Sequence, residues 1–214
     1  MKNIDLTFFN TLKIRLQESK NGEIFHKLFL PKNRDFFLVD DKKAQKFKKS
    51  AVLLLLYYRN NRLKSILIQR PSYNGAHSNQ ISLPGGKYED NDTNLINTAI
   101  RETFEEISVK SICEDVLGSL TPIAIPISRF AVYPYVSFLP IAPTIVIDER
   151  EVIEFIEFDI HDFLFHTDII ITEVDAIDQQ LTVPAFTINN RIVWGATAMI
   201  LNEFKEIALE SLEF

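Results

Sequence analysis

Residues 82–109 read SLPGGKYEDNDTNLINTAIRETFEEISV. The segment opens with two glycines after a proline, a combination that lets the backbone turn tightly and approach a ligand or a metal closely. The second half has helical character, and we expect a helix over residues 93–108 with Asp92 or Thr93 as its N-terminal cap. The segment therefore joins a glycine bend to a helix.

Acidic and apolar side chains take different sides of this helix. At about 100° per residue, Glu102, Glu105 and Glu106 lie within an arc of about 100°. The apolar residues expected on the opposite side are Ile96, Ile100, Phe104 and Ile107. We therefore expect the helix to pack on the core through one side and to present three acids on the other.

Stability alone does not favour acids at this place. Glu102 and Glu106 form an i,i+4 pair of like charge, which destabilises a helix by roughly 0.2–0.5 kcal/mol. Both also lie near the helix C-terminus, where the macrodipole disfavours negative charge. A divalent cation reverses this balance, because clustered oxygen ligands suit Mg²⁺ or Mn²⁺. The alternative, for such a string taken by itself, is a solvated acidic surface.

The flanking sequence predicts a mixed α/β architecture. Residues 51–58 are apolar throughout, which is typical of a central strand buried on both faces, and they are followed by a turn at 59–62 and a second strand at 65–69. Residues 71–91 are expected to form a long loop. Further strands are expected over 118–124, 131–139, 153–158, 169–175 and 181–188, and further helices over 5–19 and 195–209. This order predicts a mixed β-sheet sandwiched between α-helices.

Composition narrows the class of protein. The chain of 214 residues suffices for one domain, expected over 46–214, with a helical extension over 1–45. Its 23 basic and 29 acidic residues give a net charge of −6, which argues against a nucleic-acid-binding face. The longest apolar run is too short to cross a bilayer, and the first residues lack the pattern of a secretory signal. We therefore expect a cytoplasmic protein that binds neither nucleic acid nor membrane.

The glycine bend and the helix resemble the Nudix box, the signature of the Nudix hydrolase family, with the pattern G-x5-E-x7-R-E-U-x-E-E-x-G-U (U, aliphatic). The matching residues are Gly86, Arg101, Glu102, Glu105, Glu106 and Val109. Asp92 replaces the first glutamate, Thr103 an aliphatic residue and Ser108 a glycine, and the gap before the arginine is one residue longer. The longer gap and the threonine resemble the coenzyme A diphosphatase branch of the family.

A second stretch resembles the same branch. Residues 70–86, RPSYNGAHSNQISLPGG, are similar to the branch signature R-S-x-x-L-R-x-H-x-G-Q-U-S-F-P-G-G. The coinciding residues are Arg70, His77, Gln80, Ser82, Pro84, Gly85 and Gly86. Gly75 and Asn79 depart from the signature, and Gly75 removes an arginine that could contact a phosphate. Residues 127–134 and 192–198 also resemble this branch.

The resemblance implies a metal-dependent hydrolase that cleaves the phosphoanhydride bond of a nucleoside diphosphate derivative. Coenzyme A or an acyl-CoA is the first candidate, giving adenosine 3′,5′-bisphosphate and 4′-phosphopantetheine. Glu102, Glu105 and Glu106, with the backbone at Gly86, are the candidate ligands of Mg²⁺ or Mn²⁺. Glu105 and Glu106 are also candidate catalytic residues, together with Glu151 from a distal loop. The alternatives are a Nudix pyrophosphatase acting on ADP-sugars or NADH-type substrates, and a catalytically silent nucleotide-sensing domain.

Arg70, His77 and Gln80 are the candidate substrate-binding residues. For Arg70 the alternative is a salt bridge to a box carboxylate, and for His77 it is a surface hydrogen bond. Arg101 is expected to be structural and to pair with an acid of the preceding loop. Trp194 is expected to pack in the core, with a pocket wall as the alternative. A homodimer is compatible with the sequence.

Overall fold

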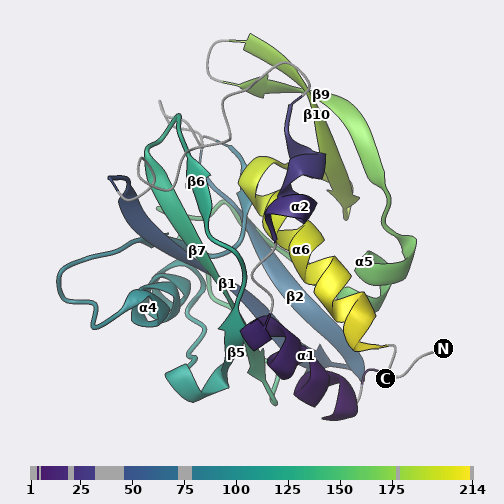
Figure 1. The fold of residues 1–214 in the computed structure, drawn as a ribbon. Helices are drawn as coiled ribbons and strands as arrows, with labels where there is room; N and C mark the ends of the chain where they lie inside the picture. The colour runs from purple at the N-terminus through teal and green to yellow at the C-terminus, as the bar shows by residue number, and fades with distance from the viewer. Residues whose placement is uncertain are drawn as a thin grey trace.

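The structure, a computed structural model, describes residues 4, 6–18, 22–31, 46–71, 79–176 and 179–212. His77 lies outside these ranges. In the described residues, helices cover both faces of a mixed β-sheet (Figure 1), as the sequence predicts. No helix in these ranges is both long enough and apolar enough to cross a membrane.

The apolar run at 51–58 becomes the centre of the sheet. It lies in β1 (Lys48–Arg59), which pairs antiparallel with β2 (Arg62–Gln69) and parallel with β7 (Phe130–Leu139). The side chains of residues 53–57 are fully buried. A strand with neighbours on both edges and helices over both faces has no solvent-facing side, which explains why its polarity does not alternate.

The turn between β1 and β2 is a hairpin turn over the expected residues 59–62. Asn60 and Asn61 have φ angles of 52° and 59°, and Arg59 pairs directly with Arg62. Two consecutive residues with positive φ are typical of a two-residue hairpin turn. The four residues 59–62 therefore form the hairpin turn that the sequence predicts, and β2 begins at Arg62 and not at the expected residue 65.

Short strands complete the sheet around the glycine bend. They are β3 (Ile81–Ser82), β4 (Gly85–Lys87), β5 (Val116–Ser119) and β6 (Ile123–Ile125), whereas the longer β8 (Glu154–Asp159) matches the strand expected over 153–158. Ala51 of β1 pairs with Gly86 of β4, which fixes the bend against the central strand. The segment 71–91 is therefore not wholly a loop, and the strand expected over 118–124 is two strands. Strands of two to four residues carry too little alternation to be recognised from sequence.

Alternate side chains of β1 enter different layers of the core. The long helices are α1 (Leu6–Glu18), α4 (Leu95–Ile107) and α6 (Gly195–Ser211). Leu53 and Leu55 pack in the cluster that includes residues of α4. Leu54 and Leu56 pack in the larger cluster that includes α1 and α6. Figure 1 shows α4 on one side of the sheet and α1 with α6 on the other.

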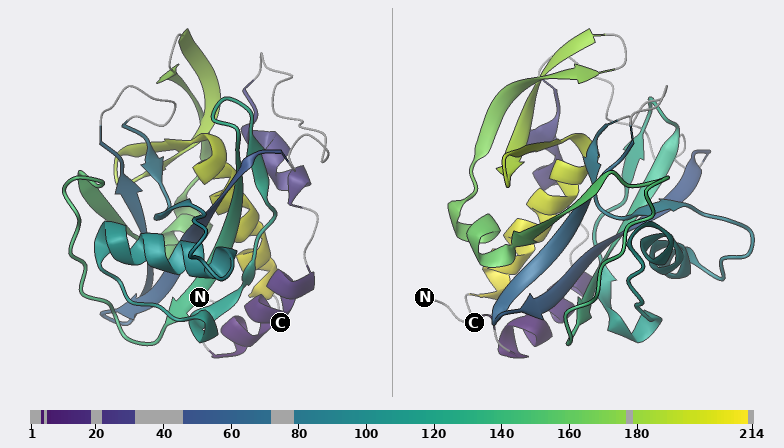
Figure 2. Two further views of the ribbon diagram at one scale, coloured as in Figure 1. Left: turned by 90° about the vertical axis from the view of Figure 1, so that its left-hand side faces the viewer. Right: turned by 180° about the vertical axis from the view of Figure 1, so that it is seen from behind.

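A second sheet lies beside α6 in both views of Figure 2. Its strands are β9 (Ile169–Ala176), β10 (Gln179–Ile188) and β11 (Arg191–Trp194). In the part of the chain that the structure describes, the remaining helical elements are short, namely α2 (Glu23–His26), η1 (Lys27–Phe29), η3 (Cys113–Asp115) and α5 (Ile160–His166). The sequence did not predict these four or β11, because none is long enough to show its period. The helices expected over 5–19 and 195–209 are confirmed as α1 and α6.

The N-terminal cap of α4 is Asn94, whose side chain accepts a hydrogen bond from the Asn97 N–H at 3.0 Å. The expected caps, Asp92 and Thr93, were wrong. The Asp92 carboxylate bonds to Arg101 instead, and Asn94, two residues later, supplies the capping side chain.

The buried side of α4 is rotated by roughly a quarter turn from the expected one. Phe104, expected in the core, is 44% exposed, whereas Ala99 and Thr103 are fully buried. Glu106, expected to face away from the core, is only 1% exposed. The expectation was wrong because β4 and the segment before β8 cover this side of the helix, as the Glu106 hydrogen bonds to both segments show.

Candidate active site

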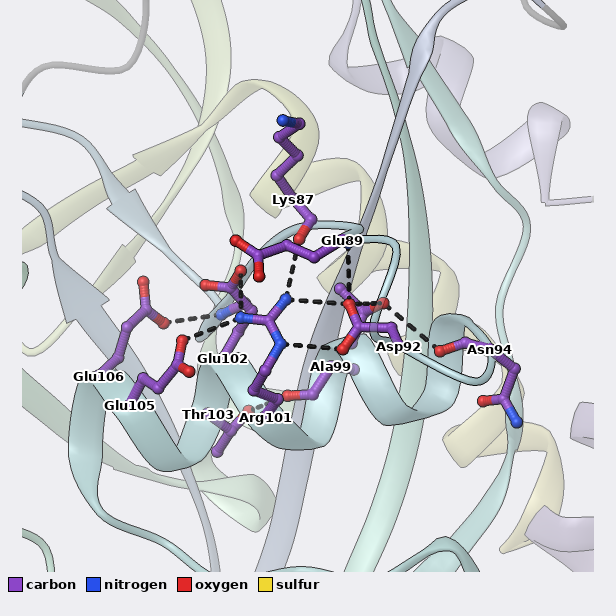
Figure 3. Close-up of polar contacts among 12 residues, drawn as sticks. Lys87, Glu89, Asp92, Asn94, Ala99, Arg101, Glu102, Thr103, Glu105 and Glu106 are labelled. Atoms are coloured by element: carbon purple, nitrogen blue, oxygen red, sulfur yellow. Dashed lines mark hydrogen bonds and ion pairs between the residues drawn. The ribbon is translucent and has the colours of Figure 1, made fainter.

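Arg101 organises the acidic side of α4. Its Nε and Nη2 atoms donate to the Asp92 carboxylate at 2.9 and 3.0 Å, and Nη2 also donates to the Lys87 carbonyl at 3.0 Å. Nη1 donates to Glu102 Oε1 at 3.0 Å and to Glu105 Oε2 at 2.9 Å. Figure 3 shows the guanidinium between these groups. The prediction that Arg101 pairs with an acid of the preceding loop is confirmed.

Asp92, which takes the place of the first glutamate of the Nudix box, is the anchor of this network. Its carboxylate also accepts the Glu89 N–H at 3.0 Å and the Thr98 hydroxyl at 2.8 Å. Only 5% of the Asp92 side chain is exposed. The hydrogen bonds from Arg101 hold the pKa of Asp92 well below its usual range. The ion pair therefore ties the loop before α4 to the middle of the helix.

The other two departures from the box keep its geometry. The buried hydroxyl of Thr103 donates to the Ala99 carbonyl at 2.7 Å, so a polar group is satisfied at an aliphatic position. Ser108 caps the C-terminus of α4 with φ 57°, the left-handed conformation for which glycine is common. The turn that ends the helix is therefore retained without the glycine.

Gly85 and Gly86 bring β4 against the acids for two different reasons. Gly85 has φ 146°, a conformation that residues with a side chain rarely adopt, and its N–H donates to Glu106 Oε2 at 2.7 Å. At Gly86, an added Cβ atom would lie 2.2 Å from Glu102 Oε2. A side chain there would displace the Glu102 carboxylate from the strand.

The pairing of β4 with β1 determines which glycine turns its backbone toward the acids. Main-chain hydrogen bonds join Pro84 and Tyr88 to β1. Gly86 lies midway between them in the strand, so its backbone N–H and C=O also point toward β1. Gly85 alternates with these residues, and its N–H is directed at Glu106. Its carbonyl is therefore better placed to share a metal ion with Glu106 than the expected Gly86 carbonyl.

Glu106 is the most buried acid of the site. Besides the Gly85 N–H, it contacts Arg70, whose Nη1 lies 3.2 Å from Glu106 Oε1. Burial raises the pKa of Glu106 to about 8, although Arg70 and the Gly85 N–H act in the opposite direction. Arg70 thus forms the salt bridge to a box carboxylate that is the alternative to a phosphate contact. A buried carboxylate of this kind gains strongly from an additional cation.

The side chains of Glu102 and Glu105 are less buried than that of Glu106. The Glu102 side chain is 13% exposed and the Glu105 side chain 49%. Burial raises the pKa of Glu102, with Glu105 and Glu151 acting in the same direction and Arg101 against it. Glu105 therefore lies at the rim of the site, and Glu102 lies between the rim and Glu106.

The segment before β8 brings Glu151 to these acids. The Asp148 N–H donates to the Glu106 carbonyl at 3.0 Å, and the Glu151 N–H donates to the Asp148 carbonyl at 2.9 Å. The charge of Glu151 raises the pKa of both Glu102 and Glu106. A residue chosen from the sequence of a distant loop thus lies within electrostatic reach of the α4 acids.

The donor chemistry of the site fits a hard divalent cation. Glu102 lies within electrostatic reach of the Glu105, Glu106 and Glu151 carboxylates near the glycine bend, while the positive charge of Arg101 is shared with a fifth acid, Asp92. Mg²⁺ and Mn²⁺ prefer oxygen ligands, and carboxylates in excess over positive charges favour their binding.

A cavity of about 340 Å³ opens beside the glycine bend. Arg70 and Gln80 line it, so two of the three candidate substrate-binding residues share one cavity. Half-buried Trp194 lines it as well, which favours the pocket wall over core packing. Sequence reasoning missed Phe29 and Pro31, which line the cavity from the N-terminal segment. No pattern in the sequence pointed to Phe29 or Pro31, because both are far from the other cavity residues along the chain and reach them only in the folded protein.

Comparison with known families agrees with this geometry. Residues 47–171, more than half of the chain, match the NUDIX domain. The chain therefore belongs to the Nudix hydrolase family. It is an enzyme of the pyrophosphohydrolase type, which acts on nucleoside diphosphate derivatives.

Curated relatives and a solved structure are similar to the chain. It is 28% identical over 145 residues to proteins named "Uncharacterized Nudix hydrolase NudL" from Yersinia pestis (strain Pestoides F) and Yersinia pseudotuberculosis serotype O:1b (strain IP 31758), with 66% of this chain and 70% of each relative covered. A MutT/nudix family protein from Enterococcus faecalis superposes with a TM-score of 0.54 at 18% identity, covering 91% of this chain and 72% of that chain. The second likeness supports the fold.

Proposed function

We propose that the protein hydrolyses the phosphoanhydride bond of coenzyme A or an acyl-CoA, using a divalent metal ion held by the acids of α4. The observation that carries this proposal is the buried Glu106 carboxylate, which the Gly85 N–H and Arg70 hold beside Glu102 and within electrostatic reach of Glu151. The products would be adenosine 3′,5′-bisphosphate and 4′-phosphopantetheine or its acyl derivative.

Metal binding is assigned to Glu102, Glu105 and Glu106 with a backbone carbonyl at the glycine bend. The alternation of β4 favours Gly85 for this carbonyl over Gly86. Mg²⁺ or Mn²⁺ would neutralise pyrophosphate charge, polarise a phosphoryl oxygen and make water more acidic. Glu106, as the most buried acid, is the ligand whose loss should weaken metal binding most.

Proton transfer is assigned to a carboxylate at the rim of the site. Glu151 is our first choice and Glu105 the second, because both are exposed to water and both act electrostatically on Glu102. In the reaction, the oxygen of water bonds to one phosphorus while the bond from that phosphorus to the bridging oxygen breaks. The proton of the attacking water goes to the carboxylate, and the other phosphate carries the bridging oxygen away.

Substrate binding is assigned to Arg70, His77 and Gln80. Arg70 and Gln80 line the cavity beside the glycine bend, and a guanidinium suits a phosphate through paired hydrogen bonds. Arg70 is bonded to Glu106, so it would leave the acid for the phosphate as the metal ion replaces its charge. The choice of coenzyme A is supported by the resemblance of residues 70–86 to the coenzyme A diphosphatase signature.

We assign the activity to a domain over 46–214, with residues 1–45 as an extension, and expect a cytoplasmic enzyme whose partner is a small nucleotide substrate. A homodimer is the oligomer we expect. Size-exclusion chromatography with light scattering would measure the mass in solution.

A substrate panel tests the activity. The full chain would be incubated with coenzyme A, acetyl-CoA, ADP-ribose and NADH, with Mg²⁺ or Mn²⁺ and with or without chelator, and the products identified by mass. We expect the highest kcat/KM on coenzyme A or its thioester and loss of turnover with chelator. Preference for ADP-ribose or NADH would overturn the substrate assignment. Ligand binding without turnover on any member would favour a nucleotide-sensing domain.

A further inference from the structure

A second group of potential metal ligands lies on α5, the short helix that follows β8. Its members, the α5 cluster, are His161, Asp162 and His166. Each side chain offers one ligand atom, an imidazole nitrogen or a carboxylate oxygen, and these atoms all lie within 4.8 Å of one another. Figure 1 shows α5 and α4 on opposite sides of the sheet. The α5 cluster is therefore separate from the acidic site.

Hydrogen bonds fix the carboxylate of Asp162. Arg62 Nη2 donates to its Oδ1 at 2.9 Å and to its Oδ2 at 3.0 Å. The Asp162 N–H donates at 3.0 Å to Asp159, the N-terminal cap of α5, and Arg62 Nε pairs with that cap at 2.6 Å. A carboxylate with such partners keeps lone pairs for a metal ion and is held in one orientation. Lys64 also pairs with Asp159, so two acids and two bases meet here without an excess of positive charge.

The two imidazoles lie beside this carboxylate. His161 Nδ1 is 3.8 Å from Asp162 Oδ1, and the centroid of the His161 ring is 5.8 Å from that of His166. The Phe165 ring packs against the half-buried His161 ring, with 4.8 Å between their centroids. Asp162 and His166 are exposed, so a metal ion can reach the α5 cluster from solvent.

Contacts at the C-terminal end of α5 keep His166 near the first turn. The Thr167 hydroxyl donates to the Asp162 carbonyl at 3.3 Å, so the chain after His166 turns back on the helix. Lys205 of α6 donates to the Thr167 carbonyl at 2.6 Å. The helix has seven residues, too few to be stable by itself. Tertiary contacts therefore set the spacing of the two histidines.

The donor set of the α5 cluster fits a transition metal ion better than Mg²⁺. Imidazole suits Zn²⁺, Cu²⁺ and Ni²⁺, whereas Mg²⁺ prefers oxygen ligands. Zinc sites with three protein ligands keep water in the fourth position. At metal–ligand distances of about 2.0–2.2 Å, the ligand atoms of a tetrahedral site lie roughly 3.4 Å apart. Side-chain rotations that shorten the longest separation by about 1.4 Å would therefore close the site.

We infer that the α5 cluster binds Zn²⁺ through His161, Asp162 and His166, with water as the fourth ligand. The site lies outside the proposed hydrolytic centre, and the inference does not depend on the proposed function. A bound ion would join the first and last turns of α5. It would thereby stabilise the helix, which packs against β2 and α6.

The test is zinc binding by the full chain, measured by isothermal titration calorimetry with excess Mg²⁺ to compete at oxygen sites. Wild type should bind one Zn²⁺ more per chain than the double variant His161→Gln/His166→Gln. Each single variant should weaken this binding by more than about tenfold, because loss of even an outer partner of a metal ligand costs roughly 10- to 100-fold. Excess Zn²⁺ should raise the Tm of wild type by about 5 °C and that of the double variant by much less.

Two control variants separate the α5 cluster from other sites. Glu106→Gln removes the most buried acid of α4 and should leave this zinc binding intact. Asp168→Asn removes an exposed acid two residues beyond the cluster and should also leave it intact, which distinguishes a lost ligand from a changed surface charge. Tm values without Zn²⁺ report the fold of each variant. The exposed His166→Gln carries the test if His161→Gln is unstable.

The outcomes separate this inference from the proposed function. Equal zinc stoichiometry and affinity in wild type and the double variant would overturn the inference, as would loss of this zinc binding in Glu106→Gln. A protein that binds zinc through the two histidines but hydrolyses no coenzyme A derivative would overturn the proposed function and leave the inference standing.

Discussion

The acidic site and the apolar cavity meet at the glycine bend, yet they are built in opposite ways. The acids and their organising arginine come from one helix and the loop before it, with Glu151 added from a segment docked on the helix end. The cavity is lined by residues of β6 and β7 together with the N-terminal segment, β10 and α6, which lie far apart in the sequence. One region is local and charged, and the other is non-local and apolar.

This difference follows from what each region has to do. Charged groups at fixed separation can be placed by one helix, because residues three and four apart share a face. An apolar cavity needs walls on several sides, which no single element supplies. Substitutions in the acids should therefore change turnover of every substrate, whereas substitutions in the wall should change preference among substrates.

The largest effect is expected for Glu106→Gln. Removing this buried carboxylate should lower kcat by about 10³-fold for every substrate, because metal binding loses its central ligand. The fold should survive, since glutamine has the same size and can still accept the Gly85 N–H. Steady-state kinetics at saturating Mg²⁺ and thermal unfolding check both parts. Hydrolysis near the wild-type rate would contradict the assignment.

Glu151→Gln should have the next largest effect. If Glu151 takes the proton of the attacking water, kcat should fall by about 10- to 100-fold. Glu149→Gln is the matched control, because Glu149 is an exposed acid of the same segment. Equal rates for the two variants would move the role to Glu105, which a Glu105→Gln variant would then test.

The stability of the metal-free protein should depend on pH through Glu106. Burial raises the pKa of Glu106 to about 8 from an ordinary 4.5. Between these values the folded chain keeps a proton that the unfolded chain has lost, so stability should fall as pH rises from about 5 to about 8.

Thermal unfolding with chelator at both pH values checks this dependence. We expect a lower Tm at pH 8 than at pH 5, by on the order of 5 °C from this group, and a larger gain from Mg²⁺ at pH 8, because metal ions compete with protons. Glu106→Gln should reduce the pH dependence. An unchanged slope in that variant would place the titrating group elsewhere.

Asp92→Asn should act on stability more than on chemistry. The substitution weakens hydrogen bonds from Arg101 to a nearly buried carboxylate and should cost about 2 kcal/mol of unfolding free energy. Because the pKa of Asp92 lies below its ordinary 3.8, this stabilisation is present above pH 4 and is lost as pH falls further. Urea titrations of both proteins at pH 7 and pH 3 measure the difference, which should shrink in acid. An equal difference at both values would mean that the charge is not responsible.

The smallest effect is expected for Ser108→Gly. A left-handed residue with a side chain is strained, so glycine should stabilise the protein by about 1 kcal/mol. Urea denaturation measures this gain, and kcat should not change. Ser119→Gly, at an exposed strand position, is the control and should not stabilise. A destabilised Ser108→Gly variant would show that the serine side chain contributes more than its strain costs.

Much of the fold was predictable where the sequence repeats a physical pattern. Residues 51–58 are apolar without alternation, and the structure shows the doubly buried β1 that this pattern predicts. The strand β4 was not predictable, because Gly85–Lys87 is extended only through its pairing with β1. The rotation of α4 was not predictable either. Helical periodicity cannot tell that Glu106 is buried under other segments while Phe104 is exposed.

The sequence by itself determined the acidic chemistry. Arg101, Glu102, Glu105 and Glu106 lie within two helical turns, and short-range spacing fixes their neighbourhood. Only the tertiary structure decided which acid is buried, which glycine faces it and how Phe29 reaches the cavity. Those features depend on contacts between segments far apart along the chain, and their energy comes from burial, which exists only once the segments have come together.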